Sequence, residues 1–263
     1  MFSVKNFMLN DDVNILSEKG CFQVIEYKKD LSVTPETALF AYFCNEMNIR
    51  KRQLVCSLKE DAVVIQAGAM QWLVGDVKAT SGIKGVGDLL NKSVRGKLTG
   101  ESAIKPEYKG TGALILEPTY RHIILLDAEE WGDSIVLSDG LFLACDANLK
   151  QETIMRSNIS SAVAGNEGMF NLGIKGKGIV CIESPVPENE LIEITLNDDV
   201  LKIDGDMAIA WSGNLEFTVE RSGKSLLGSA VSGEGLVNVY RGTGKVLIAP
   251  VDKSMMNRTA ETK

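Results

Sequence analysis

Apolar and polar positions alternate along much of the chain with the two-residue period of β-strands. Residues 192–196 and 215–220 alternate at every step, a pattern that buries one face of a strand and exposes the other. Runs of this kind are separated by glycine or acidic turns, and 25 glycines against 6 prolines suit many tight turns. The pattern predicts an all-β fold of the sandwich or barrel type.

A short motif occurs three times: a basic residue, then Gly-x-Gly, then an apolar run. The interval between successive motifs is 66 residues each time, and an acidic turn between two apolar strands precedes each motif. The spacing predicts three tandem copies of one β module, at 53–118, 119–184 and 185–250. The motif glycines are predicted to be structural, because glycine permits positive φ and close strand approach. They are Gly110, Gly112, Gly176, Gly178, Gly242 and Gly244.

Residues 1–52 form a predicted extension that precedes the three copies. Residues 22–27 read as a strand, and Thr34 with Pro35 opens a helix through about Met47, with Thr34 as the N-cap. We expect this extension to cover an edge that the copies would leave open. Residues 251–263 are polar and are predicted to be a frayed tail.

Each copy also contains a glycine-flanked loop rich in small and apolar residues, at 82–96, 157–165 and 223–233. If a pseudo-threefold axis relates the copies, the three loops leave the same end of the molecule. Such apolar residues are either packed locally or offered to a partner, and the sequence leaves both interpretations open. Their leucines are weak binding candidates: Leu89, Leu90, Leu226 and Leu227.

Residues 67–70 (Ala-Gly-Ala-Met), the glycine-rich stretch 82–101 and the repeated Gly-x-Gly strands resemble the mitochondrial-biogenesis (altered inheritance of mitochondria) family. The resemblance covers about residues 53–250. It implies three modules around a pseudo-threefold axis, each similar to the tryptophan RNA-binding attenuation protein, a short variant of the double-stranded β-helix. Bacterial members are mostly of unknown function. Eukaryotic relatives are tied to organisation of the inner mitochondrial membrane, a location that we do not expect here because no transit-peptide pattern is seen. The family implies no catalytic motif to carry over.

The formal net charge of −7 argues against nucleic acid as a partner, because phosphates would be repelled. Lys109, Lys175 and Arg241 precede the three Gly-x-Gly motifs and could surround an anion, although solvated strand-end charges are the favoured interpretation. The basic run 50–52 is likewise interpreted as a solvated boundary. RNA or small-ligand binding in the manner of the attenuation protein stays as the alternative function, by analogy of fold.

Catalytic chemistry finds little support in the sequence. The single histidine, His122, cannot build the histidine-rich metal site of a cupin-like enzyme, and no Gly-x-Ser-x-Gly motif is present. His122 is interpreted as a surface or strand-end residue. Five scattered cysteines without a Cys-x-x-Cys pair indicate a reducing compartment, and we expect a cytoplasmic location.

The sequence therefore predicts a non-enzymatic binding or scaffold protein, with no catalytic residue, metal or cofactor. Its three loops would be presented to a protein or a membrane surface. Three copies in one chain could replace a trimer, or such bodies could stack as a homo-oligomer, and the sequence does not decide between these.

Overall fold

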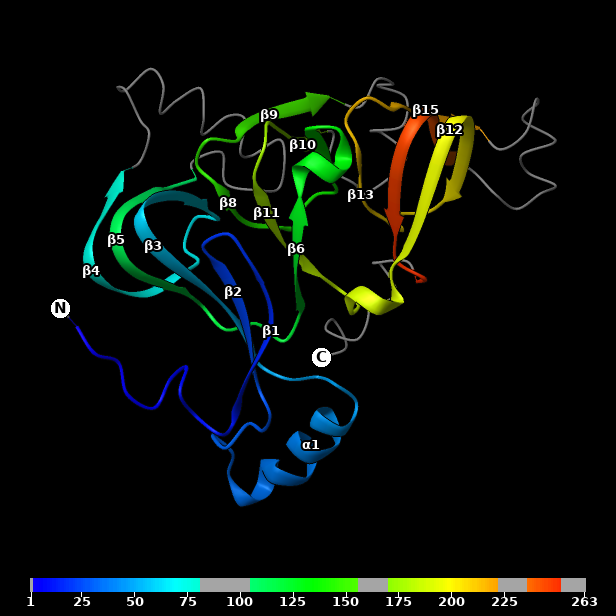
Figure 1. Ribbon diagram of the computed structural model, residues 1–263. Helices are drawn as coiled ribbons and strands as arrows, with labels where there is room; N and C mark the ends of the chain where they lie inside the picture. Colours follow the sequence, from blue (N-terminus) through cyan, green and yellow to red (C-terminus); the bar gives the residue numbers. More distant parts are fainter. Residues whose placement is uncertain (1, 81–104, 156–169, 222–235, 252–263) are drawn as a thin grey trace.

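The computed structural model describes residues 2–80, 105–155, 170–221 and 236–251 (Figure 1). The described chain is nearly all β, in two sheets of eight and seven strands, as the alternating pattern predicts. No helix within these ranges has both the length and the apolar character needed to span a bilayer. The cytoplasmic location stays a prediction.

The N-terminal extension contains a β-hairpin and a helix. β1 (Val13–Lys19) pairs with β2 (Phe22–Tyr27), and β2 pairs in turn with β3 (Arg52–Ile65), so the hairpin extends the sheet beside β3. β2 is the strand predicted at 22–27, whereas β1 was not predicted. α1 (Pro35–Glu46) begins with proline, after Thr34 in extended conformation as the N-cap. The predicted helix is therefore confirmed.

The remaining strands fall into three successive units that follow the order of the chain. Unit 1 contains β3 (Arg52–Ile65), β4 (Met70–Thr80) and β5 (Glu107–Leu116). Unit 2 contains β6 (His122–Asp127), a 3₁₀ helix (Ala128–Trp131), β7 (Ser134–Leu137), β8 (Phe142–Asp146), β9 (Lys150–Met155), β10 (Phe170–Lys175) and β11 (Ile179–Ser184). Unit 3 follows a 3₁₀ turn (Glu188–Glu190) and contains β12 (Ile192–Asp204), β13 (Ala208–Ser212), β14 (Glu216–Arg221) and β15 (Leu236–Ile248).

In units 1 and 3 the Gly-x-Gly motif lies directly opposite the acidic turn. The register of β3 against β5 shifts between Lys59 and Asp61, beside Gly110, and a comparable shift in β12 lies beside the glycines of β15. A Cβ on Gly110 would lie 2.0 Å from the carbonyl oxygen of Asp76, and one on Gly112 would lie 2.1 Å from that of Val74. These glycines therefore allow β4 to approach β5.

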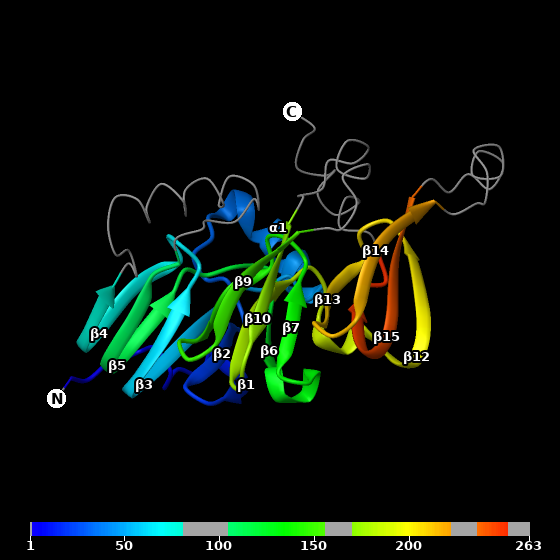
Figure 2. The same cartoon turned by 90° about the horizontal axis from the view of Figure 1, so that it is seen from above.

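The three units follow one another in a row, and strand pairing joins each to the next. β3 of unit 1 pairs with β8 of unit 2, and β7 of unit 2 pairs with β13 of unit 3. Figure 2 shows β4 at one end of the row and β12 at the other. This arrangement does not confirm the expected pseudo-threefold relation or the similarity to the attenuation protein.

The core is continuous across the junctions between units. One buried cluster joins Val64 of unit 1 to Trp131 and Ile135 of unit 2 and to Ile209 and Leu247 of unit 3. Packing therefore crosses the unit boundaries, because this one cluster contains residues of all three units.

Candidate functional site

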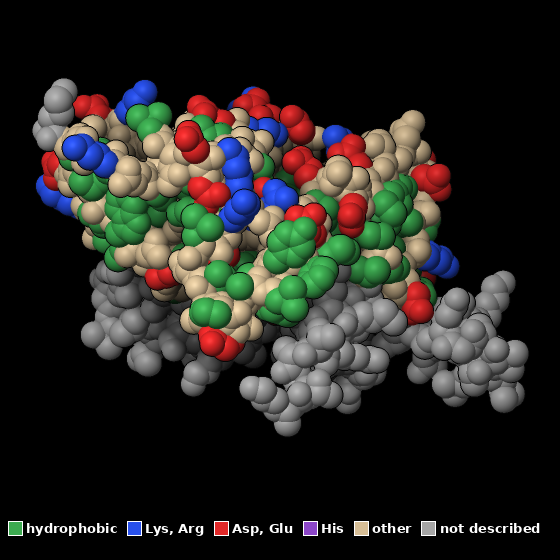
Figure 3. Space-filling view, turned by 90° about the horizontal axis from the view of Figure 1, so that it is seen from below, with side chains coloured by type: hydrophobic (Ala, Val, Ile, Leu, Met, Phe, Trp, Pro, Cys, Tyr) green, Lys and Arg blue, Asp and Glu red, His purple; other side chains and the backbone are tan. Residues whose placement is uncertain are grey.

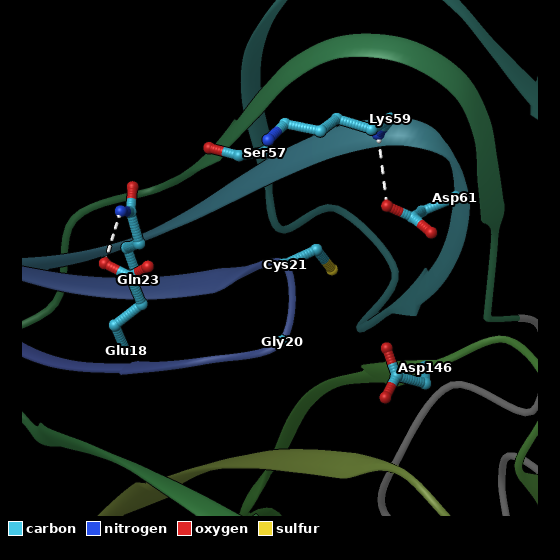
Figure 4. Close-up of a pocket in the computed structure, with 8 residues that line it drawn as sticks. All are labelled: Glu18, Gly20, Cys21, Gln23, Ser57, Lys59, Asp61 and Asp146. Atoms are coloured by element: carbon cyan, nitrogen blue, oxygen red, sulfur yellow. Dashed lines mark hydrogen bonds between the residues drawn. The ribbon is translucent and has the colours of Figure 1, made fainter.

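A cavity of about 530 Å³ opens where the β1–β2 turn, the bend of β3 and the end of β8 meet (Figure 4). It lies at the junction of units 1 and 2, and its walls come from three segments that are distant in sequence. The lining residues are Glu18, Gly20, Cys21, Gln23, Ser57, Lys59, Asp61 and Asp146.

Three carboxylates, one lysine amine and one thiol line this cavity and give it its chemistry. Oδ2 of Asp61 accepts a hydrogen bond from the backbone amide of Lys59 (3.1 Å), and Oδ2 of Asp146 accepts one from that of Ile179 (2.7 Å). Burial raises the pKa of Asp146, and the negative charges of Asp61 and Asp127 raise it further. The side chain of Cys21 points towards Asp61 and Asp146 (Figure 4).

Burial, and then the charges of Asp146 and Asp61, raise the pKa of the Cys21 thiol to about 12. The thiol is therefore protonated at neutral pH and is a poor nucleophile. In the described ranges no three histidine, cysteine, aspartate or glutamate side chains are grouped so that they could hold a metal ion. The cavity can accept a small polar or cationic group, but it does not assemble an activated nucleophile with a base.

A second feature is an apolar surface on and around α1, which projects from the sheets (Figure 1). No residue of α1 is buried, and the side chains of Phe40 and Met47 are each 74% exposed. Seen from below, apolar side chains gather over this helix (Figure 3). We define the α1 surface as its large exposed apolar residues: Leu31, Leu39, Phe40, Tyr42, Phe43 and Met47.

A buried ionic network fastens the end of α1 to the sheet. The guanidinium of Arg52, only 1% exposed, lies 2.6 Å from Oε2 of Glu26 on β2, and it donates to the backbone oxygen (3.0 Å) and Oδ1 (2.9 Å) of Asn48. Arg50 pairs with the other Glu26 oxygen at 3.1 Å and donates through Nε to Oδ1 of Asn45 on the helix at 2.6 Å. Interpreting residues 50–52 as a solvated boundary is therefore wrong for Arg52, because β2 brings a buried carboxylate to it.

His122, the only histidine, is the first residue of β6 and is half-buried. Burial, and then the charge of Arg52, lower the pKa of His122 to about 4. The imidazole is therefore neutral at physiological pH.

The three predicted cations lie on three different strands, β5, β10 and β15. Lys175 pairs with Glu152 on β9 at 2.5 Å, and Arg241 pairs with Glu220 on β14 at 2.6 Å. Lys109 is exposed. Two of the three charges are therefore already matched by a carboxylate on the neighbouring strand.

The predicted loop residues Leu89, Leu90, Leu226 and Leu227 lie outside the described residues. Sequence reasoning missed both features described above. The α1 surface had a visible signal, the unbroken apolar run 38–44, in which no polar face remains. The cavity had none, because only tertiary pairing brings Cys21, Asp61 and Asp146 together.

Comparison with known proteins places this architecture among relatives. Residues 47–251 match the mitochondrial biogenesis AIM24 family. An uncharacterized protein of Streptococcus pyogenes serotype M6 is 30% identical over 195 residues, covering 71% of this chain and 76% of that protein. The crystal structure of a Streptococcus pyogenes protein superposes with a TM-score of 0.59 and 26% identity, covering 82% of this chain and 94% of the other. The predicted family is thus confirmed: the chain belongs to the mitochondrial biogenesis AIM24 family.

Proposed function

We propose that this protein is a non-enzymatic binding protein that docks its α1 surface into an apolar groove of a protein partner. The observation that carries the proposal is an apolar helix of twelve residues, none of which is buried. Helices of this length are marginal in water, and most of their stability comes from packing an apolar face. A partner that encloses α1 would supply that packing, as in other helix-in-groove complexes.

A protein groove suits α1 better than a membrane surface does. Helices that lie in a membrane interface carry a lysine- and arginine-rich polar face, whereas α1 contains neither residue type. Of the cations beside α1, Arg50 and Lys51 already pair with Glu26 and Asp30. The net charge of −7 also opposes binding to anionic lipid.

The absence of catalysis is part of the proposal. The cavity offers three carboxylates, one lysine amine and a protonated thiol, and its lining contains no histidine that could act as a base. The three loops at 82–96, 157–165 and 223–233 remain proposed as further contact sites. The paired charges of Lys175 and Arg241 do not favour the alternative of RNA binding.

The test is photo-crosslinking in cells of the source organism, with a photoreactive phenylalanine analogue at position 43 and, as a matched control, at position 177, where the lysine side chain is 67% exposed. We expect one discrete adduct from position 43, abolished by Phe40→Ser, and none from position 177. Because Phe40 is not buried, the melting temperature should be unchanged. An adduct that persists in Phe40→Ser, or that forms equally from position 177, would refute the proposal. So would binding to phosphatidylcholine or phosphatidylglycerol vesicles that Phe40→Ser abolishes, because the partner would then be lipid.

A further inference from the structure

Both junctions between units are built in the same way, by a short antiparallel pairing. Residues 63–65 of β3 pair with residues 144–146 of β8, and residues 135–137 of β7 pair with residues 210–212 of β13. Backbone hydrogen bonds of 2.8 to 3.0 Å flank each pairing at the corresponding places. They join Gln66 to Leu143 and Ala147 to Ala62 in the first junction, and Ser138 to Ile209 and Gly213 to Ser134 in the second.

The positions of these two pairings, relative to the turn glycines and the Gly-x-Gly motifs, identify the strands that a third junction of this kind would use. The first strand of each junction is β3 or β7, from the preceding unit. Its first paired residue lies five positions before a turn glycine with positive φ: Val63 before Gly68 and Ile135 before Gly140. In unit 3 the corresponding glycine is Gly205, so the corresponding residue is Val200 on β12.

The second strand of each junction is β8 or β13, from the following unit. Its central paired residue also pairs, on its other side, with the residue two positions after the second glycine of the Gly-x-Gly motif. Cys145 pairs with Val180 in unit 2, and Trp211 pairs with Val246 in unit 3. In unit 1 the same place on β5 is Leu114, whose partner is Leu73 on β4. A third junction would therefore set residues 200–202 of β12 against residues 72–74 of β4, with Val200 opposite Val74.

Both of these edges are unpaired in the part of the chain that the structure describes. There, β12 pairs with β15 alone and β4 pairs with β5 alone. Val200 is 46% exposed and Leu73 is 36% exposed, whereas their counterparts Val63 and Cys145 in the first junction are fully buried. Exposed apolar edges of this kind are templates for pairing with another chain.

We propose that the β12 edge of one copy pairs with the β4 edge of a second copy, in the register of the two internal junctions. The two edges of one chain lie at opposite ends of the row (Figure 2), so the second copy supplies the missing strand. This interface is head-to-tail, and it therefore generates either a closed ring or a filament. Asp198 of one copy would face Asp76 of the next, with Asp199 opposite Gly75 beside it, and this repulsion makes the association stronger as salt rises.

The register is tested with two single-cysteine additions, Val74→Cys and Val200→Cys, mixed as separate proteins and oxidised. We expect a disulfide-linked dimer from the mixture. Little should form from either variant alone, from the wild type with its five native cysteines, or from Lys78→Cys mixed with Val200→Cys. The double variant Val74→Cys/Val200→Cys distinguishes pairing between two copies from closure within one chain, because closure within one chain would give a crosslinked monomer. That crosslinked monomer, or a mixture that forms no more dimer than the wild type, would overturn the proposal.

A second variant measures association without oxidation. Val200→Glu adds a negative charge at an exposed edge position opposite Arg241 of β15, so unfolding of the monomer should be unchanged while repulsion across the edge between copies increases. Sedimentation velocity should show concentration-dependent oligomers for the wild type, more of them at high salt, and loss of at least tenfold in association for Val200→Glu. A wild type that stays monomeric at high concentration and high salt, or a Val200→Glu variant that associates normally, would contradict the inference.

Discussion

Replacing Glu26 by glutamine should destabilise the protein strongly, although it changes only one atom of the side chain. Glu26 and Arg52 have side chains 5% and 1% exposed, and their closest atoms are 2.6 Å apart. Glutamine keeps the shape but leaves the guanidinium buried without its counter-charge. Removing one partner of a buried pair costs about 3–5 kcal/mol.

The lower end of that range applies here, because Arg52 also donates to the backbone oxygens of Asn48, Arg50 and Tyr120. A loss of about 3 kcal/mol lowers the melting temperature of a protein of this size by about 6–12 °C. Circular dichroism during heating, together with urea unfolding, measures both quantities.

The matched control is Asp76→Asn, which breaks an exposed pair with Lys78 at 3.7 Å, the two side chains being 84% and 80% exposed. Exposed pairs of this kind contribute little, so this control should melt like the wild type. Adding Arg52→Met to Glu26→Gln should recover part of the loss, because the unpaired charge is then gone. If Glu26→Gln loses no more stability than Asp76→Asn, the reasoning about the buried network is wrong.

Three further predictions concern groups with shifted pKa values. Asp146→Asn should stabilise the protein at neutral pH, because the pKa of Asp146 in the folded state lies above its ordinary 3.8. Measured by urea unfolding, this gain in the free energy of unfolding should disappear as the pH falls towards 3.8. An equal gain at all pH values would contradict the raised pKa. His122 has a pKa of about 4 in the folded state against an ordinary 6.5, so its contribution to stability is lost as the pH falls from 6.5 through 4. His122→Gln should reduce this loss of stability in acid. An unchanged dependence of the free energy of unfolding on pH would refute the lowered pKa. A rise from 9.0 to about 12 lowers the thiolate fraction of Cys21 roughly a thousandfold. Iodoacetamide should therefore label Cys21 far more slowly in the native protein than in urea. Peptide mass spectrometry measures the two labelling rates, and equal rates would contradict the raised pKa.

Local chemistry explains which parts of the structure could be predicted from sequence. Thr34 and Pro35 mark the start of α1 because capping depends on adjacent residues alone. Alternation across 192–196 predicted the strand that became the first part of β12, yet Ile192 is exposed and Leu196 is buried. Which positions of a strand are covered depends on neighbouring strands, and periodicity does not contain that information.

Features made by distant pairing could not be found in the same way. Arg52 is buried because the pairing of β2 with β3 sets Glu26 directly beside it, 26 positions earlier in the chain. The cavity needs the β1–β2 turn, the bend of β3 and the end of β8 to meet. Spacing along the chain therefore predicted the class of fold and the helix, and it missed the surroundings of individual charged groups.

The ionic network at the end of α1 also bears on the entropy of recognition. Arg50 and Arg52 tie Asn45 and Asn48 to Glu26 on the hairpin, so the C-terminal end of the helix is held in place before any partner arrives. This anchor reduces the orientational freedom that binding would otherwise remove, so association costs less entropy. Loosening this anchor would leave every contacting side chain in place and still weaken the complex.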